Sequence, residues 1–138
     1  MSLIGYSGTP LAKKLGFKDG MSVWFDGMPD SVRAEIDEYG LALIEVFSPQ
    51  QGLQAAHIFV TSREAMEAKL AMLRPLIDPA GCVWVSWPKK ASKQPTDITE
   101  DGIRAAILPA TDWVDIKVCA VDAIWSGLKL VIRKSART

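Results

Sequence analysis

The apolar residues of this chain fall into short runs of strand length, and segments of helical pattern separate most of them. Residues 55–60 (AAHIFV) and 82–87 (CVWVSW) are almost continuous in apolar character, which is typical of strands that are covered on both faces. Glycine, proline and aspartate bound several of the runs and mark turns. The six predicted strands are residues 21–25, 41–47, 55–60, 82–87, 114–121 and 128–133.

Capping and stop residues predict four helices between these strands. Thr9-Pro10 suits a helix start, because threonine can cap and proline is tolerated at the first helical position. Asp30 or Ser31 is expected to cap the second helix, and Thr61 with Glu64 fits a capping box for the third. The predicted helices are residues 10–16, residues 30–39, the segment between Thr61 and Pro75, and residues 99–108.

The order of these elements predicts the fold class. Strands that alternate with helices imply a mostly parallel sheet with right-handed crossovers. The loop Asp122–Gly127 is short enough for a hairpin, so the last strand should run antiparallel, between its hairpin partner and the strand that ends at Trp87. We therefore expect an α/β protein: a single three-layer Rossmann-like domain over residues 1–138, with about six strands.

Composition limits the partners. The 138 residues are 49% apolar and 23% charged, as in a globular protein, and 16 basic residues balance 16 acidic ones. A net charge of zero argues against nucleic acid or an anionic membrane as a general electrostatic partner, so any anion site must be local. No segment approaches the roughly 20 apolar residues that span a bilayer. Cys82 and Cys119 lie in apolar runs and are expected to be buried thiols in a cytoplasmic setting.

The candidate site follows from the parallel sheet. The carboxyl ends of parallel strands share one edge, so the loops that follow them converge there. This edge should gather Asp26, Thr61, Lys89, Lys90 and Asp122. We expect it to bind a small anionic ligand or a protein partner.

Lysines and tryptophans give that edge its expected chemistry. Lys93 joins the two lysines that follow Pro88, and cations beside a helix N-terminus can hold a phosphate or a carboxylate. The alternative is a solvated loop that the acidic residues after Lys93 partly neutralise. Trp87 and Trp125 sit at element ends, where they could stack on a planar ligand or pack in the core.

No residue pattern points to a catalytic group or a metal. His57 is the only histidine and lies in the middle of a predicted strand, so it is expected to be a hydrogen-bonded core residue. No second histidine or cysteine lies at ligand spacing, and no metal is expected. The Gly-x-Ser-x-Gly motif of a nucleophile elbow is absent from the sequence.

The second half of the chain resembles that of class I S-adenosylmethionine-dependent methyltransferases. The matching pieces are the strand AAHIFV, a helix, LIDPAG (Leu76–Gly81) in the place of that fold's L-K-P-G-G loop, and the strand CVWVSW. A further helix and a terminal hairpin that ends in VIRK follow. The resemblance implies a methyltransferase-like fold with a terminal antiparallel strand.

Nearly the full length also resembles a small bacterial family, domain of unknown function 3052. The residues that carry this resemblance are GYSGTPLAKKLG, VWVSWPKKASKQPTDITED and KVCAVDAIWSGLKLVIRK. The resemblance implies no activity.

The first half departs from the methyltransferase pattern. The turn after the first strand, Asp26-Gly27-Met28-Pro29-Asp30, has one glycine and a proline that lacks an N–H donor. Glu45 lies 19 residues after Asp26, near the spacing for a ribose-binding acid, but is expected to be a solvated residue of an edge strand. One strand of the usual seven is also missing between Phe47 and Ala55. These departures lead us to expect no cofactor, with S-adenosylmethionine as the alternative.

Three functional hypotheses follow. The first is a non-catalytic Rossmann-like domain that binds an anion or a partner at the lysine edge. The second is a minimal S-adenosylmethionine-dependent methyltransferase. The third is an oligomeric interaction module, in which the exposed edge strand 114–121 pairs with a second copy.

Overall fold

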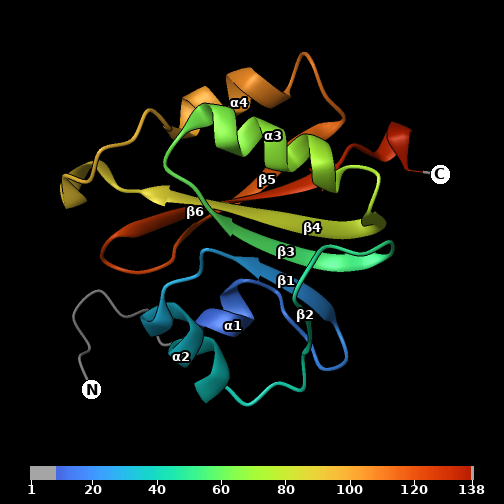
Figure 1. Ribbon diagram of the computed structural model, residues 1–138, viewed down its shortest axis with the longest axis vertical. Helices are drawn as coiled ribbons and strands as arrows, with labels where there is room; N and C mark the ends of the chain where they lie inside the picture. Colours follow the sequence, from blue (N-terminus) through green and yellow to red (C-terminus); the bar gives the residue numbers. More distant parts are fainter. Residues whose placement is uncertain (1–8, 138) are drawn as a thin grey trace.

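The structure is a computed structural model that describes residues 9–137, so the first four residues of GYSGTPLAKKLG lie outside the described part (Figure 1). The strands are β1 (Ser22–Asp26), β2 (Ile44–Val46), β3 (Leu53–Phe59), β4 (Ile77–Pro88), β5 (Trp113–Ala120) and β6 (Trp125–Ile132). The helices are α1 (Leu11–Lys14), α2 (Asp30–Glu38), α3 (Arg63–Leu73) and α4 (Glu100–Ile107), with 3-10 turns at Lys90–Ser92 and Lys134–Ala136.

The six strands form one sheet in the order β2-β1-β3-β4-β6-β5. The pairs β1–β2, β1–β3 and β3–β4 are parallel, whereas β6 is antiparallel to both β4 and β5. This arrangement confirms the predicted α/β fold, including the last strand inserted between β4 and its hairpin partner. The described residues contain no strand between Val46 and Leu53, as expected for a fold that lacks one strand of the usual seven.

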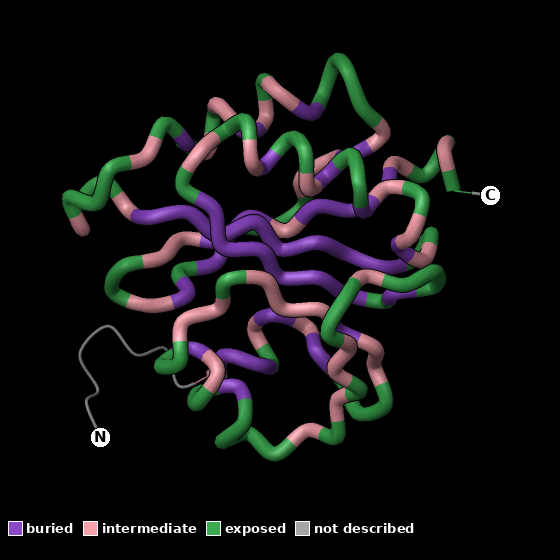
Figure 2. Tube along the Cα trace, in the orientation of Figure 1, coloured by how far each residue is buried: buried purple, intermediate pink, exposed green. Residues whose placement is uncertain are grey.

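Helices cover both faces of the sheet (Figure 1). On one face, α1 and α2 pack over a cluster that includes Leu15, Val32 and Trp84. On the other face, α3 and α4 bury Met66 and Ile103 in a second cluster. The central strands are buried along most of their length (Figure 2), which explains why β3 and β4 read as continuous apolar runs.

Hydroxyl side chains cap the two long helices on the second face. Ser62 caps α3 by accepting from the Ala65 N–H at 3.1 Å, and Thr99 caps α4 by accepting from the Gly102 N–H at 2.9 Å. The expectation that Thr61 caps α3 is therefore wrong by one residue. The carbonyl of Thr61 instead accepts a hydrogen bond from the hydroxyl of Thr96 at 2.7 Å. This bond ties the end of β3 to residues 89–99 between β4 and α4, here called the lysine loop.

Three element boundaries differ from the sequence prediction. Pro29, rather than Asp30 or Ser31, holds the cap position of α2. β2 has three residues instead of seven, because it pairs with β1 alone at the edge of the sheet. β4 starts at Ile77 and includes Pro79, since Ile77 pairs with Leu53 ahead of an irregularity in the β3–β4 register.

The connection between β2 and β3 contains no helix. Residues 47–52 lead directly from one strand to the next, and Phe47 is 91% exposed. Ile44 is exposed as well, and Trp24 on β1 is half-buried. The flank of the sheet that carries β1 and β2 is therefore thinly covered. None of the helices in residues 9–137 is long and apolar enough to cross a membrane.

Candidate functional site

The parallel strands place the ends of β1, β3 and β4 on one edge of the sheet, on the left of Figure 1. Asp26 ends β1, Thr61 follows β3, and Lys89 follows β4. Trp125 joins them, because it pairs with Pro88 and the N–H of Lys89 donates to the Ile124 carbonyl at 2.7 Å. The structure thus brings the strand-end residues of the candidate site to one edge, here called the carboxyl edge.

Asp26 forms an ion pair that the sequence did not indicate. Its partner is Lys69 in the middle of α3, the helix that connects β3 to β4. Both side chains are about one-third exposed or less. The pair links β1 to α3 and leaves Asp26 at the carboxyl edge already matched with a cation.

The turn after β1 makes a close backbone approach. Gly27 has φ +69°, and a Cβ at this position would lie 3.3 Å from the Phe59 carbonyl oxygen. Any other residue would therefore be strained and crowded at this position, which explains why it is a glycine. Pro29 then begins α2 without any side-chain cap on the helix N-terminus. The carboxyl edge thus offers a helix N-terminus beside a narrow turn.

Arg33 of α2 and Glu45 of β2 form a bidentate ion pair. The two guanidinium–carboxylate distances are 2.7 and 2.8 Å, and the guanidinium lies 5.6 Å from the ring centre of Phe25. The hydrogen bonds to Glu45 raise the pKa of Arg33, against an opposing effect of burial. Glu45 lies on an edge strand as expected, but it is paired rather than solvated, with 26% of its side chain exposed.

The lysine loop forms no ion pairs with the described residues. Lys90 and Lys93 are exposed, Lys89 is half-buried, and none of the three forms an ion pair with a described residue. Lys93 has φ +61°, which closes the 3-10 turn. These three cations therefore lie at the carboxyl edge with their charges unmatched, and their ligand role stays a prediction.

The other predicted site residues have structural partners. Trp87 is 7% exposed and packs in the core cluster below α3 and α4. Asp122 accepts the N–H groups of Ile124 and Trp125 at 2.8 and 2.7 Å, which shapes the β5–β6 turn. Trp125 is half-buried and meets Phe59 edge-on, with ring centres 5.1 Å apart. Of the two tryptophans, Trp125 is the one with a surface left for a ligand.

His57 is a fully buried core residue, as predicted. Its Nε2 lies 2.7 Å from the Ser86 hydroxyl, and its ring stacks on Phe59 at 4.3 Å. Its Nδ1 has no hydrogen-bond partner among the described residues. Burial lowers the pKa of His57 to about 3, so the imidazole is neutral and is not placed to exchange protons with a ligand at the edge.

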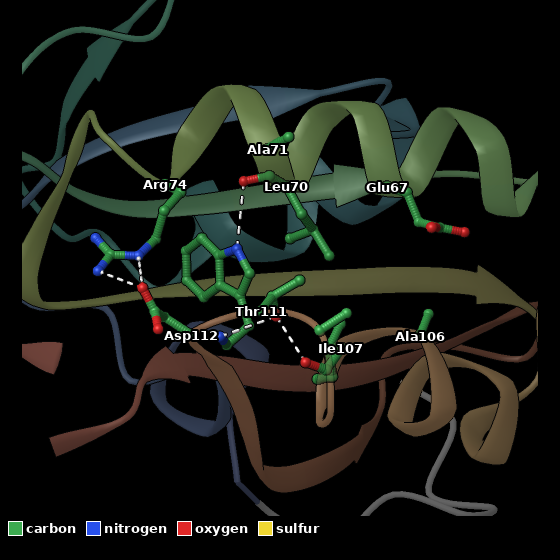
Figure 3. Close-up of a pocket in the computed structure, with 10 residues that line it drawn as sticks. Glu67, Leu70, Ala71, Arg74, Ala106, Ile107, Thr111 and Asp112 are labelled. Carbon is green, nitrogen blue, oxygen red and sulfur yellow. Dashed lines mark hydrogen bonds and ion pairs between the residues drawn. The ribbon is translucent and has the colours of Figure 1, made fainter. Parts of the chain in front are cut away.

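A groove between α3 and α4 lies at the other end of the sheet (Figure 3). Its volume is about 460 Å³, and Trp113 at the start of β5 is among the residues that line it. The charged groups at one end, Arg74 and Asp112, pair with each other at 2.9 Å. The indole N–H of Trp113 donates to the Leu70 carbonyl at 3.3 Å. Because its charges are matched and it lies away from the carboxyl edge, we assign it no part in the candidate site.

The fold is similar to those of solved methyltransferases. A protein described as a type 11 methyltransferase from Sulfolobus solfataricus aligns with a TM-score of 0.56 and 12% identity, over 98% of this chain and 94% of that one. The ribosomal protein L11 methylase of Lactobacillus delbrueckii subsp. bulgaricus aligns with a TM-score of 0.52 and 11% identity, over 89% and 77%. No family model and no curated protein matches the sequence.

The expectation that the chain uses no cofactor is corrected by a third structure. A complex of DhpI with SAH aligns with a TM-score of 0.53 and 13% identity, over 96% of this chain and 86% of that one. A cofactor-bound protein of this fold therefore spans almost the whole of the present chain, which its atypical first half did not lead us to expect. The chain has the fold of the S-adenosylmethionine-dependent methyltransferases.

Proposed function

We propose that this chain binds S-adenosylmethionine at the carboxyl edge of β1 and β2 and acts as a small methyltransferase. The observation that carries the proposal is the sheet order, with antiparallel β6 between β4 and β5, on a chain that aligns almost end to end with methyltransferase structures. The comparisons lend no support to the hypothesis of a non-catalytic domain. Membership of the domain of unknown function 3052 family is part of the same proposal.

The residues at this edge fit the cofactor by position. Glu45, one residue before the end of β2, would offer a carboxylate to which ribose hydroxyls can donate, and the uncapped N-terminus of α2 follows the carboxyl end of β1. Gly27 provides a turn in which a Cβ would crowd the Phe59 carbonyl, so backbone can approach a ligand closely there. The cofactor would supply a methyl group on a positively charged sulfur, which an acceptor atom takes with its lone pair.

Arg33 is the residue that departs from this fit. Its guanidinium occupies both oxygens of Glu45, so one hydrogen bond of the pair has to open before Glu45 can accept from a ribose. Arg33 is also close to the ring of Phe25, which gives the guanidinium a second favourable contact when it releases one oxygen. We therefore expect cofactor binding to compete with the Arg33–Glu45 pair.

The test is ligand-dependent stability. S-adenosylmethionine or S-adenosylhomocysteine at a hundred times its dissociation constant should add about 2.7 kcal/mol to the free energy of unfolding, a rise of several degrees in Tm. Glu45→Gln should lose most of this stabilisation, whereas Arg33→Ala should retain or strengthen it. Glu38→Gln, an exposed acid at the end of α2, is the matched control and should behave as the native chain.

Two results would contradict the proposal. One is the absence of any Tm shift and of any calorimetric binding at millimolar S-adenosylmethionine and S-adenosylhomocysteine. The other is equal ligand affinity in Glu45→Gln and Glu38→Gln, which would place the ligand elsewhere. Transfer itself is measured as S-adenosylhomocysteine formed in the presence of a fractionated small-molecule extract, with Glu45→Gln as the inactive control.

A further inference from the structure

Four lysines from distant parts of the chain gather beside β5 and β6. Lys117 on β5 and Lys129 on β6 are directly paired across the strands. Burial raises the pKa of the Cys119 thiol, and the charges of Lys14, Lys117 and Lys89 act against that rise. Lys117 donates to the carbonyl of Lys14 at 3.2 Å, which brings its ammonium to the end of α1. The ammonium of Lys129 lies 3.5 Å from the place of a Cβ on Gly16, just after α1. We call Lys14, Lys89, Lys117 and Lys129 the lysine cluster.

The charges of the cluster are not matched by carboxylates. Within residues 9–137, none of its four members forms an ion pair, whereas the arginines of α2, α3 and α4 all do. Like charges directly opposite each other destabilise a sheet. The facing pair Lys117–Lys129, which has no counter-charge within residues 9–137, therefore costs stability in the free protein.

Capping of α1 accounts for only part of the cluster. Lys117 donates to the Lys14 carbonyl at 3.2 Å, at the C-terminal end of that helix. However, α1 has four residues and hence a weak dipole, and this bond uses one of the donors of a single lysine. It gives no reason for Lys129 to place its ammonium beside Gly16 as well.

We propose that the lysine cluster binds a phosphate group of the substrate that accepts the methyl group. Four cations from α1, the end of β4 and the β5–β6 hairpin suit a multiply charged anion better than a single carboxylate. Lys89 connects the cluster to the carboxyl edge, where half-buried Trp125 presents an aromatic surface to the rest of the molecule that carries the phosphate. This proposal rests on the proposed function, because the bound molecule is a methyl acceptor only if the chain is a methyltransferase.

The experiment measures anion binding without any cofactor. Tripolyphosphate, inorganic phosphate and adenosine monophosphate are titrated against chloride at the same ionic strength, with Tm and calorimetry as readouts. At least one phosphate compound should raise Tm beyond the chloride control, and the double variant Lys14→Gln, Lys117→Gln should weaken its affinity tenfold or more. Lys134→Gln, an exposed lysine near the C-terminus, is the matched control and should bind as the native chain does.

The variants also test whether the cluster has a structural role instead. Because Lys117 faces Lys129, Lys117→Gln should leave Tm of the free protein unchanged or raise it. A fall in Tm together with unchanged phosphate affinity would overturn the proposal, as would equal loss of affinity in Lys134→Gln. If the native chain binds S-adenosylmethionine but none of the phosphate compounds, this inference fails and the proposed function stands. If it binds a phosphate compound but not S-adenosylmethionine, the proposed function fails and the anion site stands.

Discussion

His57 shows most directly how one residue sets a property of this protein. It is fully buried, its Nδ1 has no hydrogen-bond partner within residues 9–137, and its pKa is lowered to about 3 because burial disfavours the charged ring. The unfolded chain binds a proton at this residue below pH 6.5, whereas the folded chain does so only near pH 3. Folding therefore becomes less favourable as the pH falls through that interval.

We expect His57 to contribute a loss of about 1.4 kcal/mol in the free energy of unfolding per pH unit between pH 6 and pH 3. Urea unfolding of the native chain and of His57→Gln at several pH values measures it. The variant should be less stable at pH 7 and should show a shallower fall toward acid. Identical slopes for the two chains would show that His57 does not titrate on unfolding.

The residues of the candidate site that lie at strand ends could be predicted from the sequence. The residues that helices and hairpins bring next to those strand ends could not. Asp26 and Lys89 follow recognisable strands, so their shared edge could be expected. Lys69, which pairs with Asp26, lies 43 positions away on a helix face whose rotation no local pattern specifies. Cys82 and Cys119 are free, buried thiols, which confirms the prediction made from their apolar runs.

At the scale of elements, the long runs were predictable and their ends were not. β4 shows the reason: Pro79 and Gly81 indicate a turn, but backbone pairing with β3 extends the strand back to Ile77. β2 shows the reverse, because seven apolar-rich residues form three residues of strand when only one neighbour is available. Strand length depends on partners that are distant in sequence.

The β3–β4 irregularity requires the glycine at position 81. A Cβ there would lie 2.6 Å from the Gln54 carbonyl oxygen, a backbone atom that cannot move without opening the pair. Gly81→Ala should therefore destabilise the protein by about 3 kcal/mol through overpacking. Chemical denaturation measures the change, and Ala80→Ser, an exposed neighbour, should stay within about 0.5 kcal/mol of the native chain. Equal stabilities of the two variants would contradict this account.

At the scale of the whole molecule, the sheet is covered unevenly. β3, β4 and β6 have strands on both sides and apolar clusters on both faces. β2 is a three-residue edge strand, and only the short 47–52 connection leads from it to β3. This asymmetry follows from the missing strand, which the sequence did predict.

Amide hydrogen exchange should reveal the asymmetry. We expect the amides of β2 and of the residues before it to exchange by local opening at a free energy well below that of global unfolding. The amides of Val83 and Val85 in β4 should exchange only through global unfolding, because both residues are fully buried in the centre of the sheet. Uniform protection of β2 and β4 would mean that the thinly covered flank is as stable as the centre.

The direct connection at residues 47–52 also bears on how the protein would respond to its ligand. Glu45 belongs to the short edge strand next to that connection, so a molecule held there would tether the part of the chain that opens most readily. Occupancy should then be reported by slower exchange at Glu45 and Val46 long before any change in the protected centre. The free protein should then open locally at the β2 flank of the sheet. When the ligand site is saturated, this local opening should be suppressed, so that the flank unfolds only together with the rest of the protein.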